Sequence, residues 1–175
     1  MDGLLFDSER IVQRSWEIAG DELGIPHMED VIYHTLGMNR AGRNEYFRKY
    51  IREDFPFEEF GKLTRDNFWK IVDKEGLPLK KGAKELLAYG KSQGYKMAVA
   101  TSSSREYAMG NLIRAGIDSH FDSMVCGDMV KKAKPDPEIY QKACESLGIQ
   151  PEYCMAFEDA PGGILSAHQA GIHVI

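Results

Sequence analysis

Apolar residues recur at helical spacing through the first half of the chain. The pattern predicts helices over residues 8–23, 28–36, 41–55 and 58–75. Glycines follow the ends of several of these segments, as helix-terminating glycines do. The sequence therefore predicts an all-helical unit, rich in aromatic residues, over residues 9–77.

A different pattern follows Pro78, in which short apolar runs alternate with helical segments. We expect strands over residues 95–100, 123–126, 154–157 and 172–175. We expect helices over residues 81–92 and 136–147, and two more helices that end at about residues 115 and 170. Strands and helices that alternate at this spacing form βαβ units. The predicted fold class is α/β, with a doubly wound parallel sheet as its core.

Polar residues border the ends of these predicted strands. Because ligands of such sheets lie beyond the carboxyl ends of the strands, these residues are the candidates for a site. They are Asp2, Thr101, Ser102, Ser103, Asp128, Glu158 and Asp159, together with Lys134 just before Pro135.

Thr101 and Lys134 are candidates for binding an anion. Thr101 ends a predicted strand and precedes a helix, where a hydroxyl and backbone N–H groups form an anion site. The same position also suits a simple helix N-cap. Lys134 can neutralise a phosphoryl group or a carboxylate, or it can belong to a solvated basic loop before a helix that begins near Pro137.

Glu158 and Asp159 place two adjacent carboxylates directly after a predicted strand. Two such groups repel each other unless a cation lies between them, and Mg²⁺ favours oxygen ligands of this kind. Alternatively, the two carboxylates cap the next helix, whose N-terminus favours negative charge. We therefore expect either a magnesium site or a helix cap here.

The composition is that of an ordinary globular protein, with 43% hydrophobic and 28% charged residues among 175. A net charge of −5 disfavours nucleic acid and anionic membranes as partners, because both select a basic surface. No apolar run approaches the ~20 residues of a membrane span and no signal peptide is recognisable, so we expect a cytoplasmic protein. Cys126, Cys144 and Cys154 lack metal-ligand spacing and are expected to be buried thiols.

Four segments carry a family resemblance. They are residues 2–9 (Asp-Gly-Leu-Leu-Phe-Asp-Ser-Glu), 99–103 (Val-Ala-Thr-Ser-Ser), 134–140 (Lys-Pro-Asp-Pro-Glu-Ile-Tyr) and 157–164 (Phe-Glu-Asp-Ala-Pro-Gly-Gly-Ile). In this order they resemble the motifs of the haloacid dehalogenase-like phosphohydrolases, in the subfamily of beta-phosphoglucomutase and the sugar-phosphate phosphatases. The resemblance implies a Rossmannoid core over residues 1–8 and 78–175, with an inserted helical cap over residues 9–77.

The resemblance also implies a reaction through an aspartyl phosphate with Mg²⁺ as cofactor. Thr101 and Lys134 would share the charge of the transferring phosphoryl group. Asp2 would act as general acid and then as the base that activates water. The metal ligands implied are Asp2, Glu158 and Asp159.

For the substrate, the resemblance implies a small phosphorylated metabolite, either a sugar or a nucleoside phosphate, bound by a monomer. Arg40, in a Gly-x-x-Arg segment, would meet its distal end, and Ser102 and Ser103 would contact it. Arg40 also suits an ordinary exposed loop. Val12 stands where the mutases of this family carry a histidine, which favours a phosphatase over a mutase.

The nucleophilic aspartate of the family's first motif would fall immediately before Met1. We therefore expect the 175 residues to be trimmed at both ends and inactive as they stand. The expected function is a phosphatase. The alternatives are a phosphosugar mutase of the beta-phosphoglucomutase type and a catalytically inactive binding or regulatory protein.

Overall fold

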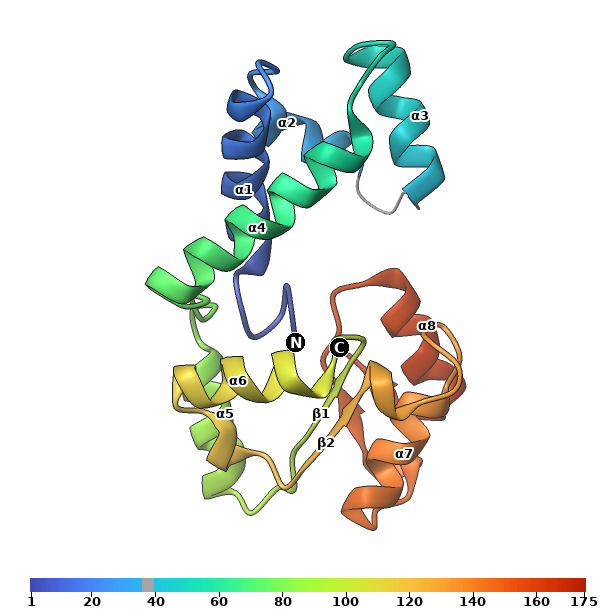
Figure 1. The fold of residues 1–175 in the computed structure, drawn as a ribbon. Helices are drawn as coiled ribbons and strands as arrows, with labels where there is room; N and C mark the ends of the chain where they lie inside the picture. The colour runs from blue at the N-terminus through green and yellow to red at the C-terminus, as the bar shows by residue number, and fades with distance from the viewer. Residues whose placement is uncertain (36–39) are drawn as a thin grey trace. The chain divides into compact units, whose positions relative to one another are not determined.

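The computed structural model describes residues 1–35 and 40–175, apart from the side chain of Arg40. The described chain divides into two compact units (Figure 1). One unit combines Met1–Asp7 with Leu77–Ile175, and the other is Ser8–Gly76. The second unit is thus an insertion between two parts of the first.

Helices make up the inserted unit. Its elements are α1 (Ser8–Glu22), α2 (Met28–Val31), the 3-10 helix η1 (Ile32–His34), α3 (Arg40–Tyr50) and α4 (Phe57–Glu75). The helix expected over residues 28–36 is therefore split between α2 and η1. The predicted helical character is confirmed for the residues that the structure describes. No described helix of either unit has the length and apolar character needed to cross a membrane.

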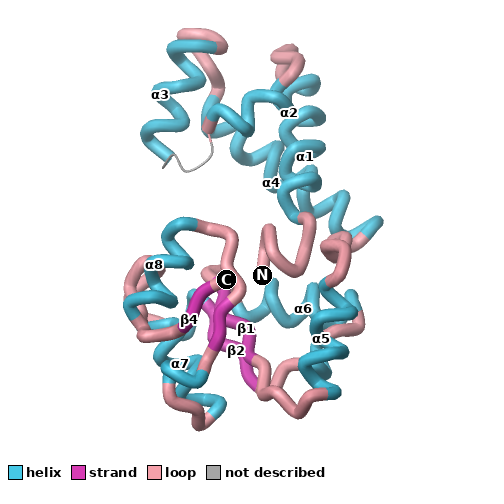
Figure 2. The backbone as a smooth tube through the Cα atoms, turned by 180° about the vertical axis from the view of Figure 1, so that it is seen from behind, coloured by secondary structure: helices cyan, strands magenta, loops and turns pink. Residues whose placement is uncertain are grey.

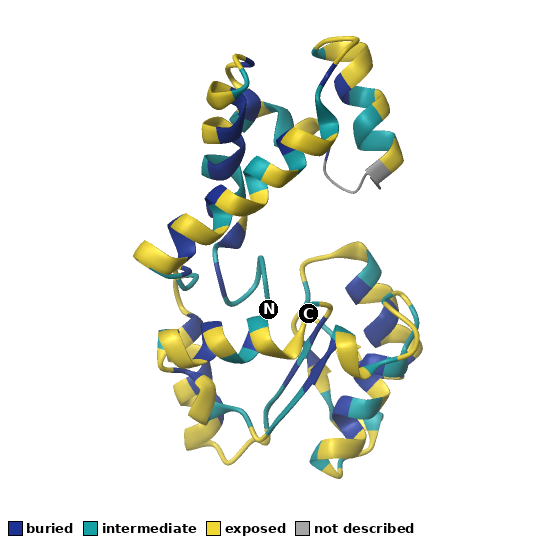
Figure 3. Ribbon diagram, in the orientation of Figure 1, coloured by how far each residue is buried: buried dark blue, intermediate teal, exposed yellow. Residues whose placement is uncertain are grey.

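Aromatic rings fill the interior of the helical unit, where Figure 3 shows the buried positions in dark blue. Trp16 of α1 meets Phe47 of α3 edge to face, with ring centroids 5.6 Å apart. Phe60 of α4 meets Trp16 in the same geometry at 5.3 Å. Such aromatic pairs contribute about 0.5–1.5 kcal/mol beyond the area that they bury. Aromatic packing therefore joins these three helices.

The other unit alternates strands and helices. Its helices are α5 (Ala83–Ser92), α6 (Arg105–Ala115), α7 (Glu138–Leu147) and α8 (Pro161–Gln169). Its strands are β1 (Ala98–Thr101), β2 (Ser123–Cys126), β3 (Met155–Ala156) and β4 (His173–Val174). Its short 3-10 helices are η2 (Asp118–His120), η3 (Gly127–Met129) and η4 (Pro151–Tyr153). In Figures 1 and 2, α5 and α6 lie on one side of the strands and α7 and α8 on the other. The predicted α/β class is confirmed.

The strands pair in parallel as two separate two-stranded sheets, β1 with β2 and β3 with β4. The register places Ala98 opposite Ser123 and Met155 opposite His173. The sequence predicts one continuous sheet, and the structure instead shows two pairs whose hydrogen bonds run within each pair. Strands β3 and β4 are also shorter than predicted, because their pairing extends over two residues of each strand.

Residues 1–7 belong to the α/β unit, although the helical unit follows them in the chain. Phe6 is fully buried and forms an antiparallel bridge with Leu79. The N–H of Gly3 donates to the Phe6 carbonyl at 3.0 Å, and Gly3 has a φ of 75° that few other residues adopt without strain. This tight loop fixes Asp2 against the α/β unit.

Candidate active site

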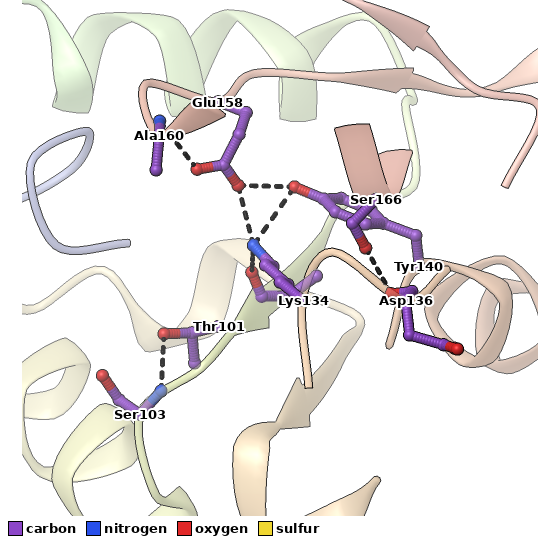
Figure 4. A network of polar contacts seen from close by, with 9 residues as sticks. Thr101, Ser103, Lys134, Asp136, Tyr140, Glu158, Ala160 and Ser166 are labelled. Atoms are coloured by element: carbon purple, nitrogen blue, oxygen red, sulfur yellow. Dashed lines mark hydrogen bonds and ion pairs between the residues drawn. The ribbon is translucent and has the colours of Figure 1, made fainter. Parts of the chain in front are cut away.

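The carboxyl ends of β1 and β3 carry polar residues that the sequence analysis singled out. Thr101 is the last residue of β1, and Glu158 follows the end of β3 by two residues. Figure 4 shows Lys134 between these two strand ends, with its ammonium group directed at Glu158. The same ammonium group donates to the Ala100 carbonyl of β1 at 3.3 Å. A single lysine therefore connects the two strand pairs.

A buried ion pair joins Lys134 and Glu158. The Nζ atom of Lys134 lies 2.7 Å from Oε2 of Glu158, and the two side chains are 12% and 8% exposed. Burial alone would raise the pKa of Glu158, but the hydrogen bonds from Lys134 and Tyr140 hold that pKa below its ordinary value. Glu158 is therefore ionised at neutral pH, with its charge balanced by Lys134.

Two further hydrogen bonds and a neighbouring glycine confine the Glu158 carboxylate. The Tyr140 hydroxyl donates to Oε2 at 2.6 Å, and the Ala160 N–H donates to Oε1 at 3.2 Å. Burial and the hydrogen bond to Glu158 raise the pKa of Tyr140, so its hydroxyl keeps its proton. The backbone of Gly163 lies against the carboxylate, and a Cβ atom at Gly163 would be only 2.1 Å from Cδ of Glu158. The carboxylate therefore has little freedom to move.

The loop that carries Lys134 is shaped by the Glu138 carboxylate. This group accepts hydrogen bonds from the backbone N–H of Lys131 at 3.0 Å and of Lys132 at 2.9 Å. The ammonium group of Lys142 and these two amides lower the pKa of Glu138 to about 2. Glu138 therefore stays ionised and holds the loop in place over a wide pH range.

A second polar cluster surrounds Asp2. The Ser103 hydroxyl donates to Oδ2 of Asp2 at 2.9 Å, and the Tyr107 hydroxyl donates to Oδ1 at 3.0 Å. Burial and the neighbouring Asp2 carboxylate raise the pKa of Tyr107, so this hydroxyl also remains a donor. The two hydroxyls hold both oxygens of Asp2 in a defined orientation.

The loop after β1 is held by its own backbone and by Gly127. The buried Oγ1 of Thr101 accepts the N–H of Ser103 at 3.2 Å. The N–H of Gly127 donates to the Ser103 carbonyl at 2.9 Å, and a Cβ atom at Gly127 would lie 2.2 Å from the Ser102 carbonyl oxygen. Ser102 is exposed. Thr101 and Ser103 thus belong to the interior of the loop, and Ser102 to its surface.

Asp128 is explained by helix capping. Its carboxylate accepts the N–H of Arg105, the first residue of α6, at 3.0 and 3.2 Å. A carboxylate at the start of a helix satisfies free N–H groups and favours the helix dipole. We therefore assign Asp128 a structural role.

Asp159 lies beside the loop that carries Asp2, and both residues carry oxygen atoms of the kind that a hard divalent cation binds. The exposed Asp159 lies so close to Gly3 that a Cβ atom on Gly3 would sit 2.1 Å from its Oδ2. Carboxylate and backbone carbonyl oxygens, which Asp159 and Asp2 supply, are the ligands that Mg²⁺ prefers. Glu158 is engaged by Lys134 instead, and in the described part of the chain the carboxylates of Asp2, Glu158 and Asp159 do not gather as one cluster.

The structure thus brings Asp2 together with Ser103, and Lys134 together with Glu158. Arg40 begins α3, but its side chain and residues 36–39 lie outside the described residues, so its expected role is not tested. Sequence reasoning missed the two tyrosine hydroxyls. Tyr140 is the last residue of the motif-like segment 134–140, and this position could have marked it as a site residue. Tyr107 lies inside a predicted helix that gives no such signal.

Comparison with known proteins identifies the family of this chain. The haloacid dehalogenase-like hydrolase family matches the chain over residues 1–175. A phosphorylated carbohydrates phosphatase of Thermotoga maritima is 34% identical over 175 residues, which are 100% of this chain and 81% of the relative. Hexitol phosphatase A of Escherichia coli is 31% identical over 100% of this chain and 79% of its own length.

Solved structures show the same similarity in three dimensions. A Thermotoga maritima protein named as a beta-phosphoglucomutase candidate superposes with a TM-score of 0.83 at 31% identity, over 99% of this chain and 81% of that chain. CbbY from Rhodobacter sphaeroides, solved in complex with phosphate, superposes with a TM-score of 0.69 at 26% identity, over 99% and 81%. The motifs, the fold and these relatives agree, and the chain belongs to the haloacid dehalogenase-like hydrolases.

Proposed function

We propose that this protein is a Mg²⁺-dependent phosphatase of a small phosphorylated metabolite, in the first place a sugar or sugar-alcohol phosphate and otherwise a nucleoside phosphate. The observation that carries the proposal is the buried ammonium group of Lys134 between the ends of β1 and β3. The relatives named for phosphorylated carbohydrates and for hexitol support the substrate class.

In this proposal Lys134 and the loop after β1 bind the transferring phosphoryl group. Lys134 supplies a positive charge in a largely water-excluded position, where electrostatic attraction is stronger than in bulk water. Thr101 supplies a hydroxyl and a strand end that opens onto a helix N-terminus. Mg²⁺, held by Asp159 and the backbone of Asp2, would neutralise further charge on the phosphoryl oxygens.

Asp2 is proposed to transfer the proton. It would protonate the leaving alcohol and then remove a proton from the attacking water, as a positioned carboxylate can. The hydroxyls of Ser103 and Tyr107 hold this carboxylate in one orientation through neutral hydrogen bonds.

The family's nucleophilic aspartate would stand directly before Met1. Burial lowers the pKa of the Met1 amino group, and the nearby charges of Asp2, Glu158, Lys134 and Asp159 also affect that pKa. A residue attached at that point would therefore enter the same site. In this proposal the 175 residues supply the groups that bind the phosphate ester, and an aspartate at that position would be the nucleophile.

We assign catalysis to one unit and substrate selection to the other. Residues 1–8 and 78–175 would form the catalytic core, and residues 9–77 would form a cap that selects the substrate through Arg40. Val12, at the position of the mutase histidine, packs against the aromatic core of the helical unit, which favours hydrolysis over isomerisation.

The test compares two chains with sorbitol 6-phosphate, glucose 6-phosphate and a nucleoside monophosphate, with and without Mg²⁺. The first is the 175-residue chain, and the second carries an apolar strand that ends in aspartate fused before Met1. We expect Mg²⁺-dependent phosphate release by the second chain alone. Asp2→Asn should reduce it by about 10²–10⁴-fold, whereas Asp7→Asn, which alters an aspartate 3.7 Å from Lys80, should not.

Three outcomes would contradict the proposal. Turnover by the first chain that Asp2→Asn abolishes would require a new nucleophile. Isomerisation without phosphate release would favour the mutase. No reaction of the second chain with any of these esters would leave a binding or regulatory protein.

A further inference from the structure

Two cysteines meet between α7 and the segment that leads into β3. The Sγ atom of Cys144, on α7, lies 3.6 Å from the Sγ atom of Cys154, which directly precedes β3. Cys144 is 4% exposed and belongs to an apolar cluster against which Cys154 also packs. The pair therefore lies at the edge of the packed interior, with Cys144 inside it.

The two thiols are not equivalent. The thiol of Cys144 donates to the sulfur of Cys154, and the thiol of Cys154 donates to the Gln150 carbonyl at 3.5 Å. Burial, together with the hydrogen bond to Cys154, raises the pKa of Cys144 to about 12, so Cys144 keeps its proton. Cys144 is thus the less reactive of the two thiols.

Cys154 is the more accessible of the two residues. It is partly exposed, whereas Cys144 is 4% exposed. Cys144 lies behind it in the apolar cluster. Oxidation of a cysteine follows its thiolate character and its exposure, so an oxidant that reaches this face reacts with Cys154 before Cys144.

The same two segments are joined a second time at the active site. Tyr140 lies one helical turn before Cys144 on α7, and its hydroxyl donates to Glu158, which lies four residues after Cys154. Residues four apart share one face of a helix. The contact between the tyrosine and the glutamate therefore holds the cysteine-bearing segments side by side and keeps the two sulfurs adjacent.

We propose that Cys144 and Cys154 form a peroxide-reactive dithiol that closes to an intramolecular disulfide. In the first step the thiolate of Cys154 attacks hydrogen peroxide, the O–O bond breaks, and a sulfenic acid and hydroxide form. In the second step the sulfur of Cys144 attacks that of Cys154, the S–O bond breaks, and the hydroxyl leaves as water with the proton of Cys144. Two thiols are oxidised, and one peroxide is reduced to two waters.

The test treats the native protein, at low micromolar concentration, with hydrogen peroxide and follows it by intact mass and peptide mapping. We expect a loss of two hydrogen atoms, a peptide pair cross-linked through Cys144 and Cys154, and full reversal by dithiothreitol. Free Cys154 should disappear at least about tenfold faster than Cys126, which is fully buried at the end of β2.

Single variants separate the two steps. Cys144→Ser and Cys144→Ala should stop at a sulfenic acid on Cys154 that dimedone captures, and circular dichroism should show that one of them stays folded. Cys154→Ser should leave Cys144 as unreactive as Cys126, and Cys126→Ser should form the disulfide as before. Peroxide that leaves all thiols intact, that oxidises Cys154 without cross-linking in the native protein, or that joins two molecules would overturn the proposal.

Discussion

The two carboxylates at the centre of the α/β unit are held in opposite ways. Glu158 is 8% exposed in its side chain and contacts a buried ammonium group at 2.7 Å, with a tyrosine hydroxyl at 2.6 Å beside it. Asp2 is partly exposed and accepts hydrogen bonds from the hydroxyls of Ser103 and Tyr107, at 2.9 and 3.0 Å. One carboxylate is paired with a charge, and the other with neutral groups.

This difference assigns different tasks to similar groups. A buried, charge-paired carboxylate stays ionised over a wide pH range and positions its partner. A carboxylate held by two hydroxyls keeps a fixed orientation, as a proton-transferring group requires. Under our proposal, Glu158 fixes the lysine that binds the phosphoryl group, and Asp2 handles the proton.

The largest effect should follow from breaking the charged pair. Lys134→Met leaves the buried Glu158 carboxylate without its cation, and removing one partner of such a pair costs about 3–5 kcal/mol. Urea unfolding at pH 7 measures the change in the free energy of unfolding.

Lys132→Met is the matched control in the same loop. The Lys132 side chain is 73% exposed and lies 3.5 Å from Asp136, so its loss should cost less than about 1 kcal/mol. Equal losses in the two variants would show that the pair of Lys134 and Glu158 does not differ from a surface ion pair.

The loss caused by Lys134→Met should shrink as the pH falls from 7 to 4. In the native protein the pKa of Glu158 lies below its ordinary value, so its stabilisation is present above the unfolded pKa of about 4.3 and disappears as the pH falls through the folded pKa. Without Lys134, burial should raise the pKa of Glu158. Acid then reduces the loss of stability of the variant, because it protonates the buried carboxylate. Unfolding curves at several pH values measure the difference. A difference that stays constant with pH would contradict this assignment.

Gly163→Ala tests how tightly the Glu158 carboxylate is confined. A Cβ atom there would lie 2.1 Å from Cδ of Glu158, so the carboxylate must leave its partners, at about 1–3 kcal/mol. The adjacent Gly162→Ala meets no atom within 4 Å and should be neutral or stabilise by up to about 1 kcal/mol, as alanine does in a helix. Thermal melting of the two variants compares them directly. A Gly163→Ala protein as stable as Gly162→Ala would show that Glu158 is free to move.

The two tyrosine hydroxyls should each contribute about as much as one hydrogen bond to a carboxylate. Tyr140→Phe removes a hydrogen bond to the more buried carboxylate and should cost about 2 kcal/mol, whereas Tyr107→Phe should cost about 1 kcal/mol. Chemical unfolding of both variants gives the two values. The reverse order would contradict the contrast between the two carboxylates.

Much of the fold could be predicted from local patterns. Helical periodicity located α1, α4 and α7 to within about two residues, because their apolar faces repeat every three or four positions. Strand lengths and sheet continuity were harder to predict, because pairing depends on which backbone lies alongside. The predicted strand over residues 154–157 pairs over two residues only, as β3.

The candidate site shows the same limit. Lys134 and Glu158 stood out because their residue types and neighbours are typical of phosphate and metal chemistry. That they neutralise each other could not be predicted, because they are 24 residues apart in the chain. Tyr107 reaches Asp2 across 105 residues, a contact that follows only from the packing of α6 beside the first loop.

Calorimetric titration of the 175-residue chain with inorganic phosphate and Mg²⁺ tests whether the phosphoryl group binds at the ends of β1 and β3. We expect the native protein and Lys132→Met to bind phosphate alike. Lys134→Met and Thr101→Val should each bind it at least about tenfold more weakly, as expected for the loss of a contact to a charged ligand. Binding by folded Lys134→Met that is as tight as binding by Lys132→Met would show that the phosphoryl group does not bind at the ends of β1 and β3.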